Sequence, residues 1–126
     1  MGQATPFKPI ALVVEDDVLQ RELVVLLLEE SDMGVIQCDS AEAAHGVLDR
    51  MGGCVSLMFT DVNLAGAMDG LALAHFVKER FPDMHVIVTS GTPRTDLPEG
   101  AKFLAKPWRP LDVLREAERT HTSQPH

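Results

Sequence analysis

The chain has 126 residues, of which 45% are hydrophobic and 24% are charged, so it is long enough for one folded core and too apolar to be disordered. The formal net charge of -8 opposes direct binding to nucleic acid, and no apolar run approaches the roughly 20 residues that a membrane span needs. With no signal-peptide core, we expect a cytoplasmic protein with a folded unit at residues 9–120 and polar tails at 1–8 and 121–126.

Short apolar runs alternate with helical patterns along the folded unit. In chain order we expect a strand at 10–14, a helix at 18–31, a strand at 34–38, a helix at 41–51, a strand at 55–60, a helix at 70–81, strands at 84–89 and 101–105, and a helix at 110–120. Ser40 is a candidate N-cap, Gly52 and Gly53 mark a helix stop, Pro82 ends the third helix, and Pro110 suits the first turn of the last.

This alternation is typical of a parallel sheet with right-handed crossovers and helices on both faces. We therefore expect a doubly wound α/β fold. In such folds ligands bind beyond the carboxyl ends of the strands, where the strand order reverses.

Polar side chains follow four of the five expected strands. They are Glu15-Asp16-Asp17, Asp61, Thr89-Ser90 and Lys106-Pro107. Clustered carboxylates repel one another unless a cation lies among them, and Mg²⁺ prefers oxygen ligands. Asp61 as nucleophile, Mg²⁺, the ammonium of Lys106 and the hydroxyl of Ser90 form a sufficient set for phosphoryl transfer. Three acids in a row can also be a solvated helix start, and Asp61, Ser90 and Lys106 each have an ordinary surface or turn role when taken alone.

From Ile10 to about Thr120 the chain resembles the receiver domain of bacterial two-component response regulators. The segments that carry the resemblance are Leu12-Val13-Val14-Glu15-Asp16-Asp17, Thr60-Asp61-Val62-Asn63-Leu64 with Met68-Asp69-Gly70, Ser90-Gly91, and Lys106-Pro107. The resemblance implies a flavodoxin-like, five-stranded sheet in the order 2-1-3-4-5. It also implies a chain that acts as a single-domain switch, not as an enzyme on external substrates, and that slowly dephosphorylates itself.

The resemblance also assigns roles to individual residues. It implies that Asp61 accepts a phosphoryl group from a histidine kinase or a histidine phosphotransfer protein, and that Glu15, Asp16, Asp61 and the carbonyl of Asn63 form the Mg²⁺ site. Ser90 and Lys106 would hold phosphoryl oxygens, Phe103 would be the aromatic switch residue, and the Lys106-Pro107 bond would be cis. With no output domain attached, the signal would pass to an unknown downstream protein.

Two segments depart from the family pattern. Ala65 replaces a usual proline, and Gly66-Ala67 makes the loop to Asp69 one residue longer, from which we expect greater mobility. Residues 91–100 hold two prolines and two glycines where the family has a helix, so we expect a loop or a single turn.

Several other residues invite interpretation. Cys38 and Cys54 are expected to be buried, inert thiols, and Trp108 is either a packing residue or a residue that faces a partner. Phe103 has core packing as its alternative role. The five histidines lack metal-ligand spacing and are given no site; we expect them at the surface or at helix caps.

Two other functions compete with the switch. A Mg²⁺-dependent hydrolase of phosphate esters would use Asp61 as nucleophile, but it needs a second acid-base carboxylate close by, where Asn63 stands. A degenerate receiver would act only as a binding module, which the filled phosphotransfer positions disfavour.

Overall fold

The computed structural model describes residues 8–122, and the expected tail residues 1–7 and 123–126 lie outside the described part. The observed elements are β1 (Ile10–Val14), α1 (Val18–Glu30), β2 (Gly34–Cys38), α2 (Ala41–Met51), the 3₁₀ turn η1 (Gly52–Cys54), β3 (Val55–Asp61), α3 (Gly70–Arg80), β4 (His85–Ser90), β5 (Lys102–Ala105) and α4 (Pro110–Thr122). None of the helices between residues 8 and 122 has the length and apolar character needed to cross a bilayer.

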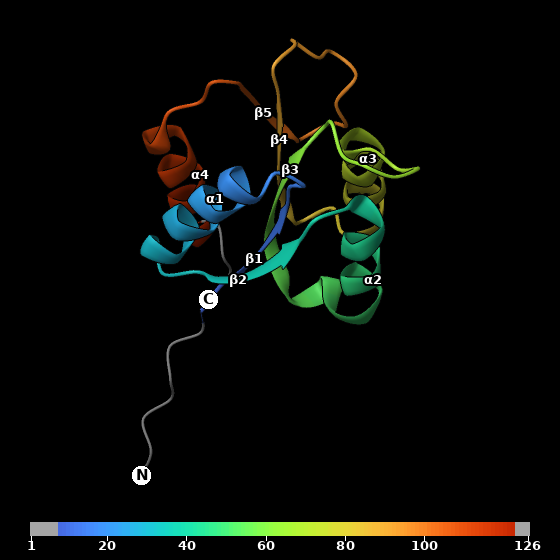
Figure 1. The fold of residues 1–126 in the computed structure, drawn as a ribbon. Coiled ribbons are helices and arrows are strands. Elements are labelled where there is room, and N and C mark those ends of the chain that lie inside the picture. Colours follow the sequence, from blue (N-terminus) through green and yellow to red (C-terminus); the bar gives the residue numbers. More distant parts are fainter. Residues whose placement is uncertain (1–7, 123–126) are drawn as a thin grey trace.

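The five strands form one parallel sheet in the order β2-β1-β3-β4-β5, as predicted. Figure 1 shows α1 and α4 on one face of this sheet and α2 and α3 on the other. The doubly wound α/β architecture is thereby confirmed. The strand order reverses between β1 and β3, so the carboxyl ends of these two strands mark the expected ligand position.

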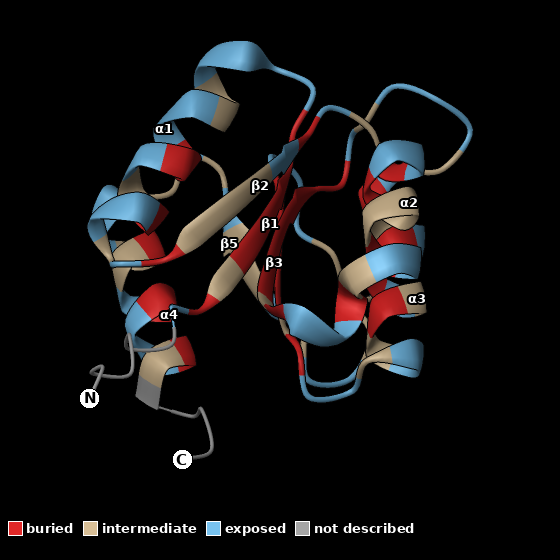
Figure 2. Ribbon diagram, turned by 90° about the horizontal axis from the view of Figure 1, so that it is seen from below, coloured by how far each residue is buried: buried red, intermediate tan, exposed pale blue. Residues whose placement is uncertain are grey.

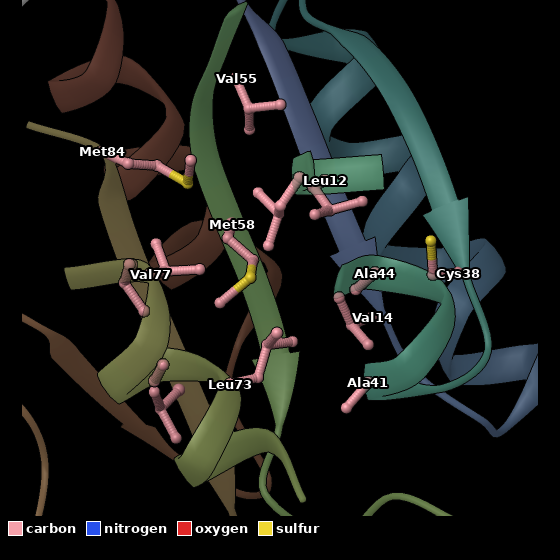
Figure 3. Close-up of a cluster of buried hydrophobic side chains, with 14 of the residues drawn as sticks. Leu12, Val14, Cys38, Ala41, Ala44, Val55, Met58, Leu73, Val77 and Met84 are labelled. Carbon is pink, nitrogen blue, oxygen red and sulfur yellow. The ribbon is translucent and has the colours of Figure 1, made fainter. Parts of the chain in front are cut away.

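The core has two layers because successive side chains of a strand point to opposite faces. On β1, Leu12 and Val14 pack toward α2 and α3, whereas Ala11 and Val13 belong to the cluster beneath α1 and α4. Figure 3 shows the first of these layers, with Met58 and Leu73 among its members. The central strands are almost wholly buried (Figure 2), as expected of strands covered on both faces.

Most element boundaries lie within one or two residues of their predicted positions, which is the usual uncertainty of helix ends. The glycines at 52 and 53 do not simply stop α2, because the chain continues through η1. The last helix extends to Thr122, so the segment predicted as a C-terminal tail begins inside α4.

The connection from β4 to β5 contains no helix between residues 91 and 101, all of which are described. This loop, orange in Figure 1, confirms the prediction that the segment replaces a helix. It packs against α3, where the ring nitrogen Nε2 of His75 lies 2.8 Å from the carbonyl oxygen of Asp96. Leu97 also contacts the core layer beneath α2 and α3.

Expectations for the cysteines, Trp108 and the histidines need correction or completion. Cys38 is buried as expected, but Cys54 is exposed because it lies in the η1 turn and not in a strand. Trp108 is a packing residue, since its ring meets Phe59 edge-on with centroids 5.8 Å apart. His121 is close to a cap, with its Nε2 2.6 Å from the carbonyl oxygen of Ser31 at the end of α1, whereas His85 is half-buried at the start of β4. His126 lies outside the described residues.

Candidate functional site

The carboxyl ends of four strands bring the predicted site residues to one edge of the sheet. Asp61 is the last residue of β3 and pairs in register with Thr89, while Ser90 ends β4 and pairs with Ala105. Glu15 directly follows β1, and Lys106 directly follows β5. The fold thus brings together residues that lie up to 91 positions apart in the sequence.

Asp61 is 4% exposed, and both of its carboxylate oxygens accept hydrogen bonds. The Nζ of Lys106 donates to Oδ2 at 2.5 Å, and the backbone N–H of Asn63 donates to Oδ1 at 3.0 Å. A lysine ammonium and a backbone N–H therefore orient a nearly buried carboxylate.

Lys106 is held in place by its backbone as well as by its side chain. Its N–H donates to the carbonyl of Ser90 at 2.9 Å, which extends the pairing of β4 and β5 by one residue. Its Nζ also lies 3.9 Å from Oε1 of Glu15. The following bond, Lys106-Pro107, is cis, as predicted.

Glu15 is a buried acid next to another acid. Its side chain is 2% exposed, and burial raises its pKa from 4.5 to about 7, with the charge of Asp61 acting in the same direction. The N–H of Asp17 donates to Oε2 at 3.1 Å and, together with Lys106, opposes that rise in pKa. The carboxylates of Glu15 and Asp61 share the single charge of the Lys106 ammonium, which leaves net negative charge between them. Such a charge imbalance favours a bound cation.

Asp16 is exposed at the same edge and contacts the loop that follows Asp61. The N–H of Ala65 donates to Oδ2 of Asp16 at 3.3 Å. Asp17, the flanking acid, is the N-cap of α1 and accepts from the N–H of Gln20 at 2.9 Å. Of the three consecutive acids, Glu15 and Asp16 therefore face the site, and Asp17 serves the helix.

Ser90 is 1% exposed, and its Oγ accepts from the N–H of Thr92 at 3.1 Å. The hydroxyl of Thr92 lies 3.4 Å from the same oxygen. Ser90 joins the site through the backbone of Lys106 and not through a direct bond to Asp61. Phe103 is half-buried on β5, paired in register with Val88.

The donor set fits a hard divalent cation. Asp61 and Asp16 accept hydrogen bonds from the N–H groups of Asn63 and Ala65 in one loop, and both acids interact with Glu15, so carboxylate oxygens of the kind that Mg²⁺ prefers gather at this edge. Among residues 8–122, no three His, Cys, Asp or Glu side chains are arranged to hold a metal ion by themselves. In the predicted set only Asp16 and Asp61 would bind the ion directly, and Glu15 would hold a water coordinated to it.

Sequence reasoning missed two residues that shape the site. A Cβ on Gly70 would lie 1.8 Å from the carbonyl oxygen of Asp61, so only glycine fits there. The sequence signal was present in Asp69-Gly70, where Asp69 caps α3 and Gly70 begins it. The second residue is Glu42, which binds the β3–α3 loop and carried no signal, because it belongs to a different part of the chain.

Comparison with known proteins identifies the class to which this fold and site belong. Residues 11–117 match the sequence model of the response regulator receiver domain. The chain is 32% identical over 114 residues to the response regulator receiver protein CpdR of Brucella abortus. This match covers 86% of this chain and 92% of CpdR. It is 35% identical over 109 residues to the response regulator protein FleR of Pseudomonas aeruginosa, covering 82% of this chain but only 22% of FleR.

A solved structure agrees with the sequence comparisons. The receiver domain of NtrX from Brucella abortus superimposes with a TM-score of 0.79 at 28% identity, covering 90% of this chain and 99% of that domain. The chain belongs to the response regulator receiver domain family of two-component signalling. Proteins of this family are phosphoacceptor switches.

Proposed function

We propose that this protein accepts a phosphoryl group from a phosphohistidine onto Asp61 in a Mg²⁺-dependent reaction. The observation that carries the proposal is the position of Asp61, a nearly buried carboxylate bonded to the ammonium of Lys106 beside the acids Glu15 and Asp16. A carboxylate nucleophile needs charge neutralisation and orientation more than a strong base, because phosphoryl transfer depends mostly on positioning and electrostatics.

In the proposed step an oxygen of Asp61 attacks the phosphorus of the phosphohistidine. A P–O bond forms, the P–N bond breaks, and its electron pair returns to the imidazole, which takes up a proton. Asn63 N–H and Lys106 Nζ orient the two oxygens of Asp61 before the attack. The Nζ of Lys106, which contacts Oδ2 of Asp61, can also donate a hydrogen bond to a phosphoryl oxygen once the product forms.

Glu15, Asp16, Asp61 and the carbonyl of Asn63 are the residues proposed to hold Mg²⁺. When bound, this cation neutralises the charge of the phosphoryl oxygens and of the carboxylates around them. Slow hydrolysis of the aspartyl phosphate by the same site would reset the switch.

The proposed switch runs through β4 and β5. Ser90 currently accepts from Thr92, and a phosphoryl group on Asp61 offers its hydroxyl a charged acceptor. Reorientation of Ser90 at the end of β4 would then favour inward movement of Phe103 on the neighbouring strand. An unidentified downstream protein would read this change.

The proposed donor is a histidine kinase or a histidine phosphotransfer protein. Four apolar side chains of α1 are exposed, namely Val18, Leu19, Leu23 and Leu26. They begin next to the N-cap Asp17, so a protein that approaches Asp61 from this edge can also bury them. Partners of this kind, and not nucleic acid or a membrane, agree with the net charge of -8.

The proposal includes action as a single-domain regulator in the cytoplasm. The chain matches 92% of CpdR, a response regulator receiver protein. Free thiols at Cys38 and Cys54 agree with a reducing compartment.

Incubation with acetyl phosphate and Mg²⁺ separates the three candidate functions. A switch gains the mass of one phosphoryl group and keeps it for a measurable time. A hydrolase turns over phosphate esters many times without accumulating label, and a pure binding module does neither.

A further inference from the structure

The loop between β3 and α3 is anchored by a residue from another part of the fold. Its residues 62–69 leave the site at Asp61 and return at Asp69, the N-cap of α3. The backbone N–H groups of this loop lie outside any helix or strand, so they need acceptors from elsewhere.

Glu42, in the first turn of α2, supplies these acceptors. Its Oε2 accepts from the N–H of Ala67 and from the N–H of Met68, both at 3.0 Å. The two donors are adjacent in the chain and converge on one oxygen. A single carboxylate thus fixes the tip of the loop.

Gly66 fits the same arrangement. Its φ of 107° lies in the region that favours glycine, and a Cβ there would approach Oε1 of Glu42 to 2.7 Å. The backbone turns at this residue directly against the carboxylate. Hydrogen bonds from the backbone N–H groups of Glu42 itself, Met68 and Ala67 lower the pKa of the Glu42 carboxyl group, so this side chain is ionised at neutral pH.

The same loop also touches the acidic edge of the site. Ala65 donates its N–H to Asp16, and Asn63 donates its N–H to Asp61. Only Gly66 separates Ala65 from Ala67, so the Glu42 anchor lies two positions along the chain from the contact with Asp16. The loop is held at Asp61, at Asp16 and at Glu42.

We propose that Glu42 is a positioning residue for the metal site, which it serves by fixing the loop that carries Asn63 and contacts Asp16. This inference rests on the proposed function, because it assumes that these two residues bind Mg²⁺. Groups that orient metal ligands without touching the ion affect affinity because an unconstrained ligand must be ordered at the moment of binding.

A simpler role for Glu42 is to stabilise α2 through the helix dipole, since acids favour the first helical turn. The two roles predict different behaviour of Glu42→Gln. Glutamine loses the charge that interacts with the dipole, but its amide oxygen still accepts the N–H groups of Ala67 and Met68. Alanine loses both.

The experiment is a Mg²⁺ titration of the wild type, Glu42→Ala, Glu42→Gln and Glu30→Ala, followed by calorimetry and by the fluorescence of Trp108, the chain's single tryptophan. Glu30 is an exposed acid at the end of α1 and controls for net charge. We expect about tenfold weaker Mg²⁺ binding in Glu42→Ala and near wild-type binding in Glu42→Gln and Glu30→Ala. Without Mg²⁺, amide exchange at Ala67 and Met68 should accelerate in Glu42→Ala and much less in Glu42→Gln.

Unchanged Mg²⁺ affinity in Glu42→Ala would overturn the positioning role and leave the proposed function intact. Equal weakening in Glu42→Ala and Glu42→Gln would also overturn it, in favour of a charge effect. If the wild type itself bound no Mg²⁺, the proposed function would fail, and the positioning role with it. Amide exchange would still report whether Glu42 anchors the loop.

Discussion

The ammonium of Lys106 donates a hydrogen bond to the carboxylate of Asp61 across 45 residues of sequence, with Nζ and Oδ2 2.5 Å apart. The lysine side chain is 25% exposed and that of the aspartate 6%. The contact therefore joins a nearly buried carboxylate to a partly exposed ammonium. It also joins β3 to the segment after β5, although β4 lies between these strands.

The first prediction concerns this lysine. Lys106→Met keeps the aliphatic part of the side chain but removes the ammonium that would bind a phosphoryl oxygen. We expect the rate of labelling by acetyl phosphate to fall by roughly 10²- to 10³-fold at saturating Mg²⁺. Lys102→Met is the matched control, since Lys102 is an exposed lysine on β5. Equal rates in the two variants would argue against a role for Lys106 in the transfer.

The second prediction concerns the hydroxyl of Ser90. Ser90→Ala should slow labelling roughly tenfold to hundredfold, since a hydrogen bond to a charged acceptor contributes about 1.5–3 kcal/mol. Ser90→Thr should recover most of the rate because it retains the hydroxyl. Stopped-flow measurement of labelling checks both variants, and failure of threonine to rescue would count against the hydroxyl as the active group.

The third prediction concerns the close approach of α3 to the site. Gly70→Ala places a Cβ 1.8 Å from the carbonyl oxygen of Asp61, so the backbone must shift. We expect the free energy of unfolding to fall by about 1–3 kcal/mol, with slower labelling because Asp61 moves. The control is Gly46→Ala within α2, where a Cβ meets nothing within 4 Å. That variant should be more stable by roughly 0.5–1 kcal/mol. Urea denaturation measures both, and a Gly70→Ala variant as stable as Gly46→Ala would contradict the packing argument.

The fourth prediction concerns the pH dependence of stability without Mg²⁺. The pKa of Glu15 is raised from 4.5 to about 7 in the folded protein, chiefly by burial. Below pH 4.5 the group is protonated in both the folded and unfolded states. Between pH 4.5 and about 7 the folded protein holds a proton that the unfolded chain has released, so the free energy of unfolding falls as pH rises.

Glu15→Gln removes this titration while keeping a side chain of the same shape. The free energy of unfolding of the wild type minus that of Glu15→Gln should therefore decline from pH 4.5 to about 7 and then level off. Glu30→Gln, which changes an exposed acid, should show no such trend. A difference that stays constant over this window would mean that Glu15 titrates normally.

The sequence predicted the fold closely because its strands carry unambiguous patterns. β1 is a β-branched apolar run stopped by acids, and its predicted bounds, 10–14, match the observed strand. The lack of a helix at 91–100 was also predictable, since proline and glycine exclude a helix interior. Parallel pairing brings all carboxyl ends to one edge, so the sequence predicted that Lys106 and Asp61 share that edge, whereas their direct hydrogen bond is a finding of the structure.

Other features depend on contacts that no local pattern encodes. The position of Glu42 beside Ala67 and Met68 arises from the packing of α2 next to the β3–α3 loop, so the sequence alone gave no reason to single it out. The exposure of Cys54 follows from the η1 turn, which two glycines permit but do not specify. The metal-binding and catalytic roles of the site residues stay predictions, because they concern bound states.

The measurement that tests the central claim most directly is the chemical location of the phosphoryl group. After labelling with acetyl phosphate and Mg²⁺, borohydride reduces an aspartyl phosphate to homoserine, which peptide mass spectrometry assigns to a residue. We predict homoserine at position 61 in the wild type and none in Asp61→Asn. Label on a different residue, or equal labelling of Asp61→Asn, would contradict the assignment of Asp61 as the phosphoacceptor.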